Sequence, residues 1–188
     1  MQIRKATIGG LLSTILTASV MAFAAGPALA QNVHLKGGAK AEPSFVDNIL
    51  TLSASGALAG LGNGDVLITL SATGNPTATC ANKGQNQPPG QNPAEVEVRG
   101  SQSIPEGEID NGNVPFSVTT EAPVSPIPGA PDCPNPNWTE TITDVAFTSA
   151  RITVEQPPGT VVLTVTCTFS SPTQNGTVPA SNVTCSSS

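Results

Sequence analysis

A strict alternation of apolar and polar residues near the C-terminus restricts the fold of this chain more than any other feature. Residues 163–169 divide into two interleaved sets, Leu163, Val165, Cys167 and Phe169 in one and Thr164, Thr166 and Thr168 in the other. Successive side chains of a strand point to opposite faces of a sheet, so this pattern predicts a strand with one buried and one polar face. We expect residues 160–169 to pair with 151–155 across the turn 156–159, whose sequence is Gln-Pro-Pro-Gly.

Shorter segments of similar character precede this strand. We expect strands at 49–55, 66–72, 77–81, 95–99, 114–120 and 138–148, and a final short strand within 178–185. The turn 60–65 separates the first two, which form either a hairpin or two successive strands. Pro and Gly gather between these segments, and no helical pattern follows residue 30. The sequence therefore predicts an all-β antiparallel β-sandwich of eight or nine short strands, immunoglobulin-like or jelly-roll-like.

Residues 1–30 have the three parts of a bacterial signal peptide. Arg4 and Lys5 give a positive start, an apolar stretch runs over residues 8–25, and Ala28 and Ala30 supply the small residues before a cleavage site. We expect cleavage after Ala30, with an uncleaved membrane anchor as the alternative. The expected location is secreted, extracellular or in the cell envelope, with no stable membrane insertion after cleavage.

The residues after this signal carry a strong negative charge. Removing Arg4 and Lys5 from the seven basic residues leaves five against thirteen acidic ones, a net charge of 5 − 13 = −8. This balance argues against nucleic acid and anionic membranes as partners. The 158 remaining residues suit one domain. We expect residues 31–45 to form a flexible lead or an edge segment and 46–188 to form the disulfide-bonded sandwich.

Four cysteines in an exported chain indicate two disulfides. Three pairings are possible, of which we favour Cys80–Cys133 and Cys167–Cys185. The first pair borders the two irregular Pro-rich segments, and a hairpin could bring the second pair together. The alternative, a metal or redox site, has little support because the chain has no Cys-x-x-Cys motif.

Three segments resemble a pattern of small secreted bacterial β-sandwich proteins of uncharacterised function. They are Gly-Leu-Gly-Asn-Gly-Asp at 60–65, a Cys-x-x-x-Gly-x-x-x-x-Pro-Gly loop within 80–93, and Cys-Pro-Asn-x-x-Trp at 133–138. The resemblance implies secretion, a β-domain and the first disulfide, and it implies no specific activity. Cys167 and Cys185 are an addition to that pattern.

No catalytic residue is expected, and the chain is not predicted to be an enzyme. His34 is the only histidine and lies in the N-terminal lead, where a Ser/His/Asp triad could not hold it. Glu95 and Glu97 share one face of a strand and are two carboxylates of the kind that a glycosidase uses, but a solvated face explains them better.

Two sets of residues are weaker candidates for binding. Trp138, with Asn135 and Asn137, could present a sugar-binding surface, although a lone Trp beside a disulfide more often packs in the core. Glu106, Glu108 and Asp110 form an oxygen-rich run that could bind calcium, without the EF-hand order of ligands. No other cofactor is expected.

The sequence therefore predicts a non-enzymatic extracellular or cell-envelope protein, structural or adhesive, such as a subunit of a surface assembly. Self-association could add the segment 33–45 to the open sheet edge of a neighbouring molecule. The alternative is an extracellular binding module for carbohydrate or another envelope ligand, with or without calcium.

Overall fold

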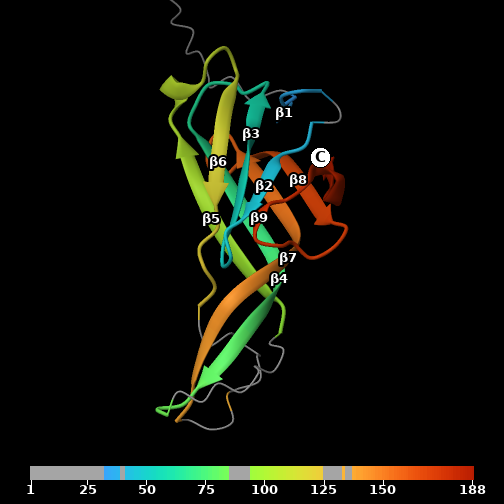
Figure 1. Ribbon diagram of the computed structural model, residues 1–188. Helices are drawn as coiled ribbons and strands as arrows, with labels where there is room; N and C mark the ends of the chain where they lie inside the picture. Colours follow the sequence, from blue (N-terminus) through green and yellow to red (C-terminus); the bar gives the residue numbers. More distant parts are fainter. Residues whose placement is uncertain (1–31, 39–40, 85–93, 125–132, 134–136) are drawn as a thin grey trace, which may run out of the picture.

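The computed structural model describes residues 32–38, 41–84, 94–124, 133 and 137–188. These residues form two antiparallel five-stranded sheets that pack face to face, with two single-turn 3-10 helices, η1 (Glu106–Glu108) and η2 (Ala180–Asn182). The predicted all-β sandwich is thus confirmed (Figure 1). The expected signal peptide lies outside the described residues, and no helix among them is long and apolar enough to cross a membrane.

Sheet A is built around strand β3 (Leu52–Ala59). On one side β3 pairs with β6 (Val114–Thr119), and on the other it pairs with both β2 (Ser44–Asp47) and the short β1 (His34–Leu35). The two-residue strand β9 (Gly176–Thr177) pairs with β2 and completes the sheet.

Sheet B has the order β10-β8-β7-β4-β5. Its strands are β4 (Val66–Ala81), β5 (Val96–Ile104), β7 (Thr139–Glu155), β8 (Val161–Phe169) and β10 (Val183–Ser187). The expected pairing of residues 151–155 with the last long strand is present as the β7–β8 hairpin. The apolar set of β8 is buried, and its threonines face outward.

The core lies between the inner faces of the two sheets. Phe45 of sheet A and Phe169 of sheet B meet edge to face, with ring centroids 5.2 Å apart and an angle of 83° between the rings. Aliphatic side chains such as Leu58, Ile68 and Val154 are fully buried around this pair. This aromatic pair thus joins the two layers, and Val, Ile, Leu and Ala side chains fill most of the rest of the core.

Two predicted strands are placed differently in the structure. Residues 49–55 do not form one strand, because a turn at Asn48–Thr51 separates β2 from β3, and Ile49 adopts a positive φ of 75° there. A hydrogen bond from the Ile49 N–H to the Asp47 carboxylate stabilises this turn. Of the two alternatives for 49–55 and 66–72, the structure has successive strands and not a hairpin, since β3 and β4 belong to different sheets.

In two places, a pair of short strands expected from the sequence is merged into one long strand in the structure. Residues 66–81 are continuous in β4, and 139–155 are continuous in β7. Gly74 and Pro76 fit inside β4 because the pairing with β7 shifts register on both sides of them. Such irregularities allow a proline within a sheet.

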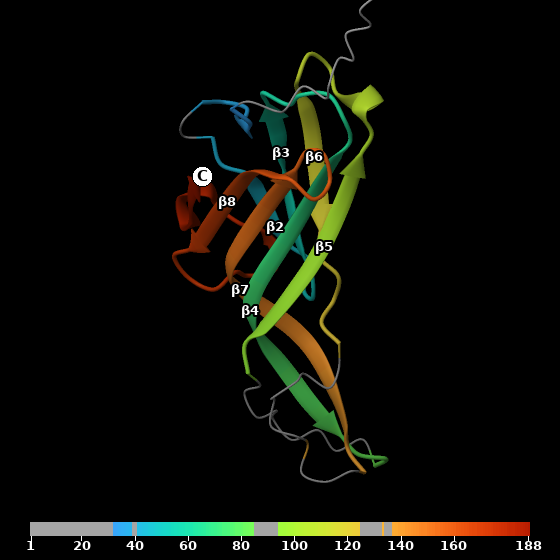
Figure 2. The same cartoon turned by 180° about the vertical axis from the view of Figure 1, so that it is seen from behind.

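The distal parts of β4 and β7 form a two-stranded arm that extends beyond the sandwich (Figures 1 and 2). β5 pairs with β4 only as far as Gly74, and β8 pairs with β7 only as far as Ser149. Residues 75–81 and 139–146 therefore pair with each other alone among the described strands. We call these two segments the arm.

Both favoured disulfides are present. Cys80 in the arm is bonded to Cys133, and Cys167 in β8 is bonded to Cys185 in β10. The second bridge joins directly opposite residues whose Cα atoms are 4.1 Å apart, as in a cross-strand pair that shares no backbone hydrogen bonds. The N–H of Cys185 consequently points away from β8, and the Glu42 carboxylate accepts it at 3.1 Å.

Candidate functional site on the outer face of sheet B

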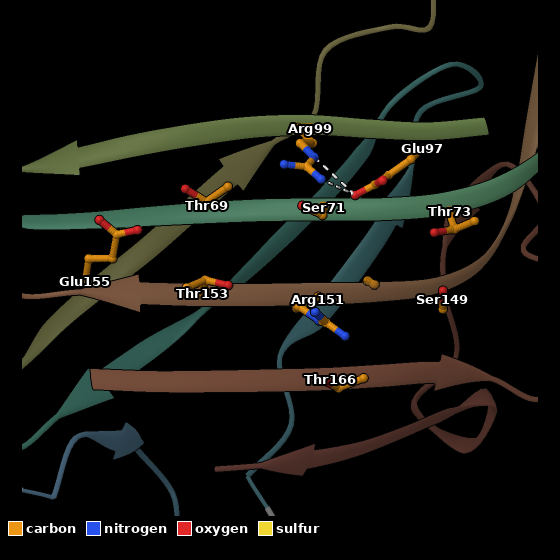
Figure 3. A pocket seen from close by; sticks show the side chains of 11 residues that line it. Thr69, Ser71, Thr73, Glu97, Arg99, Ser149, Arg151, Thr153, Glu155 and Thr166 are labelled. Atoms are coloured by element: carbon orange, nitrogen blue, oxygen red, sulfur yellow. Dashed lines mark hydrogen bonds and ion pairs between the residues drawn. The ribbon is translucent and has the colours of Figure 1, made fainter. Parts of the chain in front are cut away.

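A surface hollow lies on the outer face of sheet B. It has a volume of about 580 Å³, and side chains from β4, β5, β7 and β8 line it (Figure 3). The lining residues are Thr69, Ser71, Thr73, Glu97, Arg99, Ser149, Ala150, Arg151, Thr153, Glu155 and Thr166. We call this surface the hydroxyl face, because six of these side chains carry a hydroxyl group.

Strand register arranges these side chains in rows across the sheet. The central row runs from Arg99 through Ser71 and Arg151 to Thr166. The flanking rows are Ser101, Thr69, Thr153 and Thr164 on one side, and Glu97, Thr73, Ser149 and Thr168 on the other. Neighbouring strands lie about 4.8 Å apart, so each row presents polar groups at that interval.

Arg99 is held at one end of the central row by Glu97. The Arg99 Nε and Nη2 atoms both donate to Oε1 of Glu97, at 3.1 and 2.8 Å. The two side chains are 68% and 50% exposed, so water screens the pair. Exposed ion pairs contribute about 0–1 kcal/mol to stability, which leaves Arg99 able to exchange Glu97 for another anion.

Arg151 occupies the middle of the hydroxyl face and is exposed. Among the residues that the structure describes, none forms a hydrogen bond or an ion pair with its guanidinium group. Glu155, four residues along β7, is engaged elsewhere, since its Oε2 accepts the N–H of Gly159 at 2.6 Å. Arg151 therefore offers its donors to solvent or to a ligand.

The hydroxyl face carries no net charge, although the protein as a whole is acidic. Its two arginines balance its two glutamates, whereas the full chain has a net charge of −6. Arg99 and Arg151 are also the only arginines after Arg4. Hydroxyl groups donate and accept hydrogen bonds and guanidinium groups donate several, so this surface suits a ligand with many hydroxyl or anionic oxygen atoms.

A second polar cluster lies where the arm meets the sandwich. Asp47 is 3% exposed, and its carboxylate accepts hydrogen bonds from the Thr173 hydroxyl and the Ile49 N–H. Thr173 in turn accepts the Phe147 N–H at 2.8 Å. Burial raises the pKa of Asp47; the two hydrogen bonds oppose this shift, and the charge of Asp144 adds to it.

Asp144 completes this cluster from β7. Its Oδ1 atom is buried and has no hydrogen-bond partner among the described residues. The cluster joins β2, β7 and the loop after β8, so its effect is on the stability of that junction. Two carboxylates without a further ligand do not define a binding site.

The other predicted site residues do not come together. Asn137 is exposed and Trp138 is half-buried at the distal end of the arm, and Asn135 lies outside the described residues. Glu106 and Glu108 are exposed on η1 at the opposite end of the molecule, and Asp110 is exposed in the turn that follows (Figures 1 and 2).

The described residues contain no group of three or more His, Cys, Asp or Glu side chains placed to hold a metal ion. Calcium binding at Glu106, Glu108 and Asp110 stays a prediction from the sequence, as does ligand binding at Trp138. His34 is exposed, and its Nδ1 lies 2.6 Å from the Asn32 carbonyl oxygen.

Sequence reasoning missed the hydroxyl face as a unit. The alternating Ser and Thr residues of β4, β7 and β8 were a visible signal, but the order of the strands was needed to combine them. In the sequence, Glu97 and Arg99 could be recognised only as part of the solvated face of one strand.

The fold and this face define the chain as a disulfide-bonded all-β sandwich with a hollowed polar surface on one sheet. No protein-family model matches the chain, and neither the curated proteins nor the solved structures include a match. The resemblance to small secreted bacterial proteins therefore stays a prediction.

Proposed function

We propose that this chain is a non-enzymatic, adhesive protein of the cell exterior that binds a cell-envelope saccharide on its hydroxyl face. Export by the expected signal peptide would place it outside the cytoplasm. Two disulfides fit such an oxidising location.

The observation that carries the proposal is the set of aligned polar rows around the hollow of about 580 Å³. Strands of a sandwich hold these side chains at fixed spacing, so a ligand meets groups that are already positioned. Preorganised groups lose less conformational entropy on binding. The lining includes no aromatic side chain, so hydrogen bonds rather than ring stacking would supply the affinity.

Retention on insoluble envelope polysaccharides, including purified peptidoglycan, tests the proposal. The double variant Thr153→Val and Thr166→Val removes two hydroxyl groups from the hydroxyl face and keeps the branched shape that strands favour. We expect this variant to lose most of the retention of the wild-type protein, and to keep its melting temperature within a few degrees.

Thr141→Val is the matched control, because Thr141 is exposed on the arm of the same strand β7. This variant should be retained like the wild type. Absence of retention of the wild-type protein on every polysaccharide would overturn the proposal, and so would equal losses in the control and the double variant.

A second candidate function, a subunit of a surface assembly, is favoured by the arm. Its two strands pair only with each other among the described strands. The Val145 N–H of β7 donates to the Ile49 carbonyl oxygen, and beyond this bond no described strand covers the outer edges of the arm, where another chain could pair. Segment 33–45 is less suited to this role, because β1 and β2 already pair with β3 and Phe45 is fully buried.

Sedimentation velocity over a range of protein concentrations tests the second candidate. Assembly through the arm predicts oligomers that a charged edge substitution, Thr141→Lys, weakens. A monomer at all concentrations would reject it without affecting the proposed saccharide binding.

A further inference from the structure

We infer that the saccharide is acidic, and that Arg151 binds a carboxylate group of a uronic-acid polymer. This inference rests on the proposed function and specifies the class of ligand.

The first observation is the position and state of Arg151. It lies in the middle of the hydroxyl face with Ser71 opposite it on β4 and Thr166 opposite it on β8. Its guanidinium group has no partner among the described residues. A carboxylate would receive two parallel hydrogen bonds from this planar group, the geometry that arginine provides and lysine does not.

The second observation is the repeat of positive charge along the central row. Arg99 and Arg151 are separated by one strand, so their backbones lie about 10 Å apart. An extended uronic-acid polymer could place the carboxylates of two of its sugars at these two groups, and the hydroxyl groups of Ser71 and Thr166 would contact its ring oxygens and hydroxyls.

The third observation is the charge balance of the molecule. The chain is acidic overall, and Arg99 and Arg151, the two arginines after the expected signal peptide, lie together on one face without net charge. Arg99 can leave its exposed pair with Glu97 at little cost in free energy. A neutral glucan would gain only neutral hydrogen bonds from these arginines, whereas an acidic polymer gains two charge-assisted contacts.

Isothermal titration with oligogalacturonate, in buffer that contains a calcium chelator, tests the inference on the full chain after cleavage of the signal. A neutral cello-oligosaccharide of the same length is the comparison ligand. We expect oligogalacturonate to bind, higher salt to weaken it, and Arg151→Gln to weaken it about tenfold or more. Arg151→Lys should recover only part of that loss.

Lys36→Gln is the matched control, because it makes the same change in charge at an exposed residue next to β1 of the other sheet. It should leave binding unchanged, and all variants should keep the wild-type melting temperature. Equal binding of the neutral and acidic oligosaccharides would overturn this inference and leave the proposed function standing. Equal weakening by Arg151→Gln and Lys36→Gln would also overturn it, and so would failure of oligogalacturonate to bind, whatever the retention on envelope polysaccharides shows.

Discussion

The side chain of Gln156 forms hydrogen bonds with both backbone polar groups of Gly62. Its Oε1 accepts the Gly62 N–H at 2.8 Å, and its Nε2 donates to the Gly62 carbonyl oxygen at 2.9 Å. Nε2 also donates to the carbonyl oxygen of Gly64 at 2.9 Å. One buried amide thus fixes the Gly-rich turn by which the chain passes from sheet A to sheet B.

Loss of this amide should be costly. Gln156 is 1% exposed, so Gln156→Ala leaves backbone groups of Gly62 and Gly64 without partners. We expect the free energy of unfolding to fall by about 2–4 kcal/mol in urea denaturation. Gln174→Ala, at an exposed position, should change it by less than about 0.5 kcal/mol. A similar small change in both variants would contradict this prediction.

Asp47 should make stability depend on pH in the acidic range. Below its ordinary pKa of 3.8 the group is protonated in both folded and unfolded chains. As pH rises above 3.8, the unfolded chain releases this proton first, because burial raises the pKa in the folded state. The contribution of Asp47 to the free energy of unfolding therefore falls until the pH has passed the raised pKa, and then stays constant.

The variant Asp47→Asn isolates this effect. Its stability relative to the wild type should increase with pH over that interval, measured by urea denaturation at closely spaced pH values. Asp144→Asn removes a negative charge that raises the pKa of Asp47, so NMR titration should give a lower Asp47 pKa in that variant. A constant difference between Asp47→Asn and the wild type would contradict the prediction.

Gly100 should not tolerate a larger residue. It lies where β5 approaches β6, and a Cβ atom built at this position would lie 1.9 Å from the Thr119 carbonyl oxygen. The nearby hydrogen bond from the Glu121 N–H to the Arg99 carbonyl oxygen closes this corner of the sandwich at 2.8 Å. We expect Gly100→Ala to lower the free energy of unfolding by about 3 kcal/mol or more, or to prevent folding.

Gly107→Ala is the matched control for this substitution. A Cβ atom at Gly107 would have no neighbour within 4 Å. Its melting temperature should stay close to that of the wild type, and comparable destabilisation of both variants would show that the contact with Thr119 is not the cause.

The two disulfides should contribute unequally. They close loops with sequence separations of 53 and 18 residues. On a chain-entropy model, removal of Cys80–Cys133 costs about 4 kcal/mol and removal of Cys167–Cys185 about 3 kcal/mol. Paired Cys→Ala variants compared by urea denaturation measure both losses. Unchanged stability in either paired variant would contradict the expectation for that bridge.

The sequence predicted the elements whose patterns are local. The alternation in 163–169 and the adjacent turn at 156–159 predicted the β7–β8 hairpin correctly, because strand period and turn residues act over a few positions. The turn at Asn48–Thr51 was missed because Ile49, an unusual residue for positive φ, carries no turn signal. The continuity of β4 was missed because Pro76 normally ends a strand.

The candidate site was less predictable, since it depends on which strands become neighbours. Ser71 and Arg151 are far apart in the sequence, and they come together only because β4 and β7 pair in register. No residue of the central row stands out in its own segment. The acidic run 106–110 and Trp138 stood out by composition, yet they lie at opposite ends of the molecule.

The Cys167–Cys185 bridge also determines how the molecule responds to mechanical force. A pull on Ser188 would peel β10 from β8 one residue pair at a time, the mode in which a strand resists least. After Ser187 and Ser186 the load would reach the bridged pair and pass through a covalent bond into β8, in the interior of sheet B. A chain held at this end would therefore carry tension without separating the part of β10 that precedes the bridge from β8.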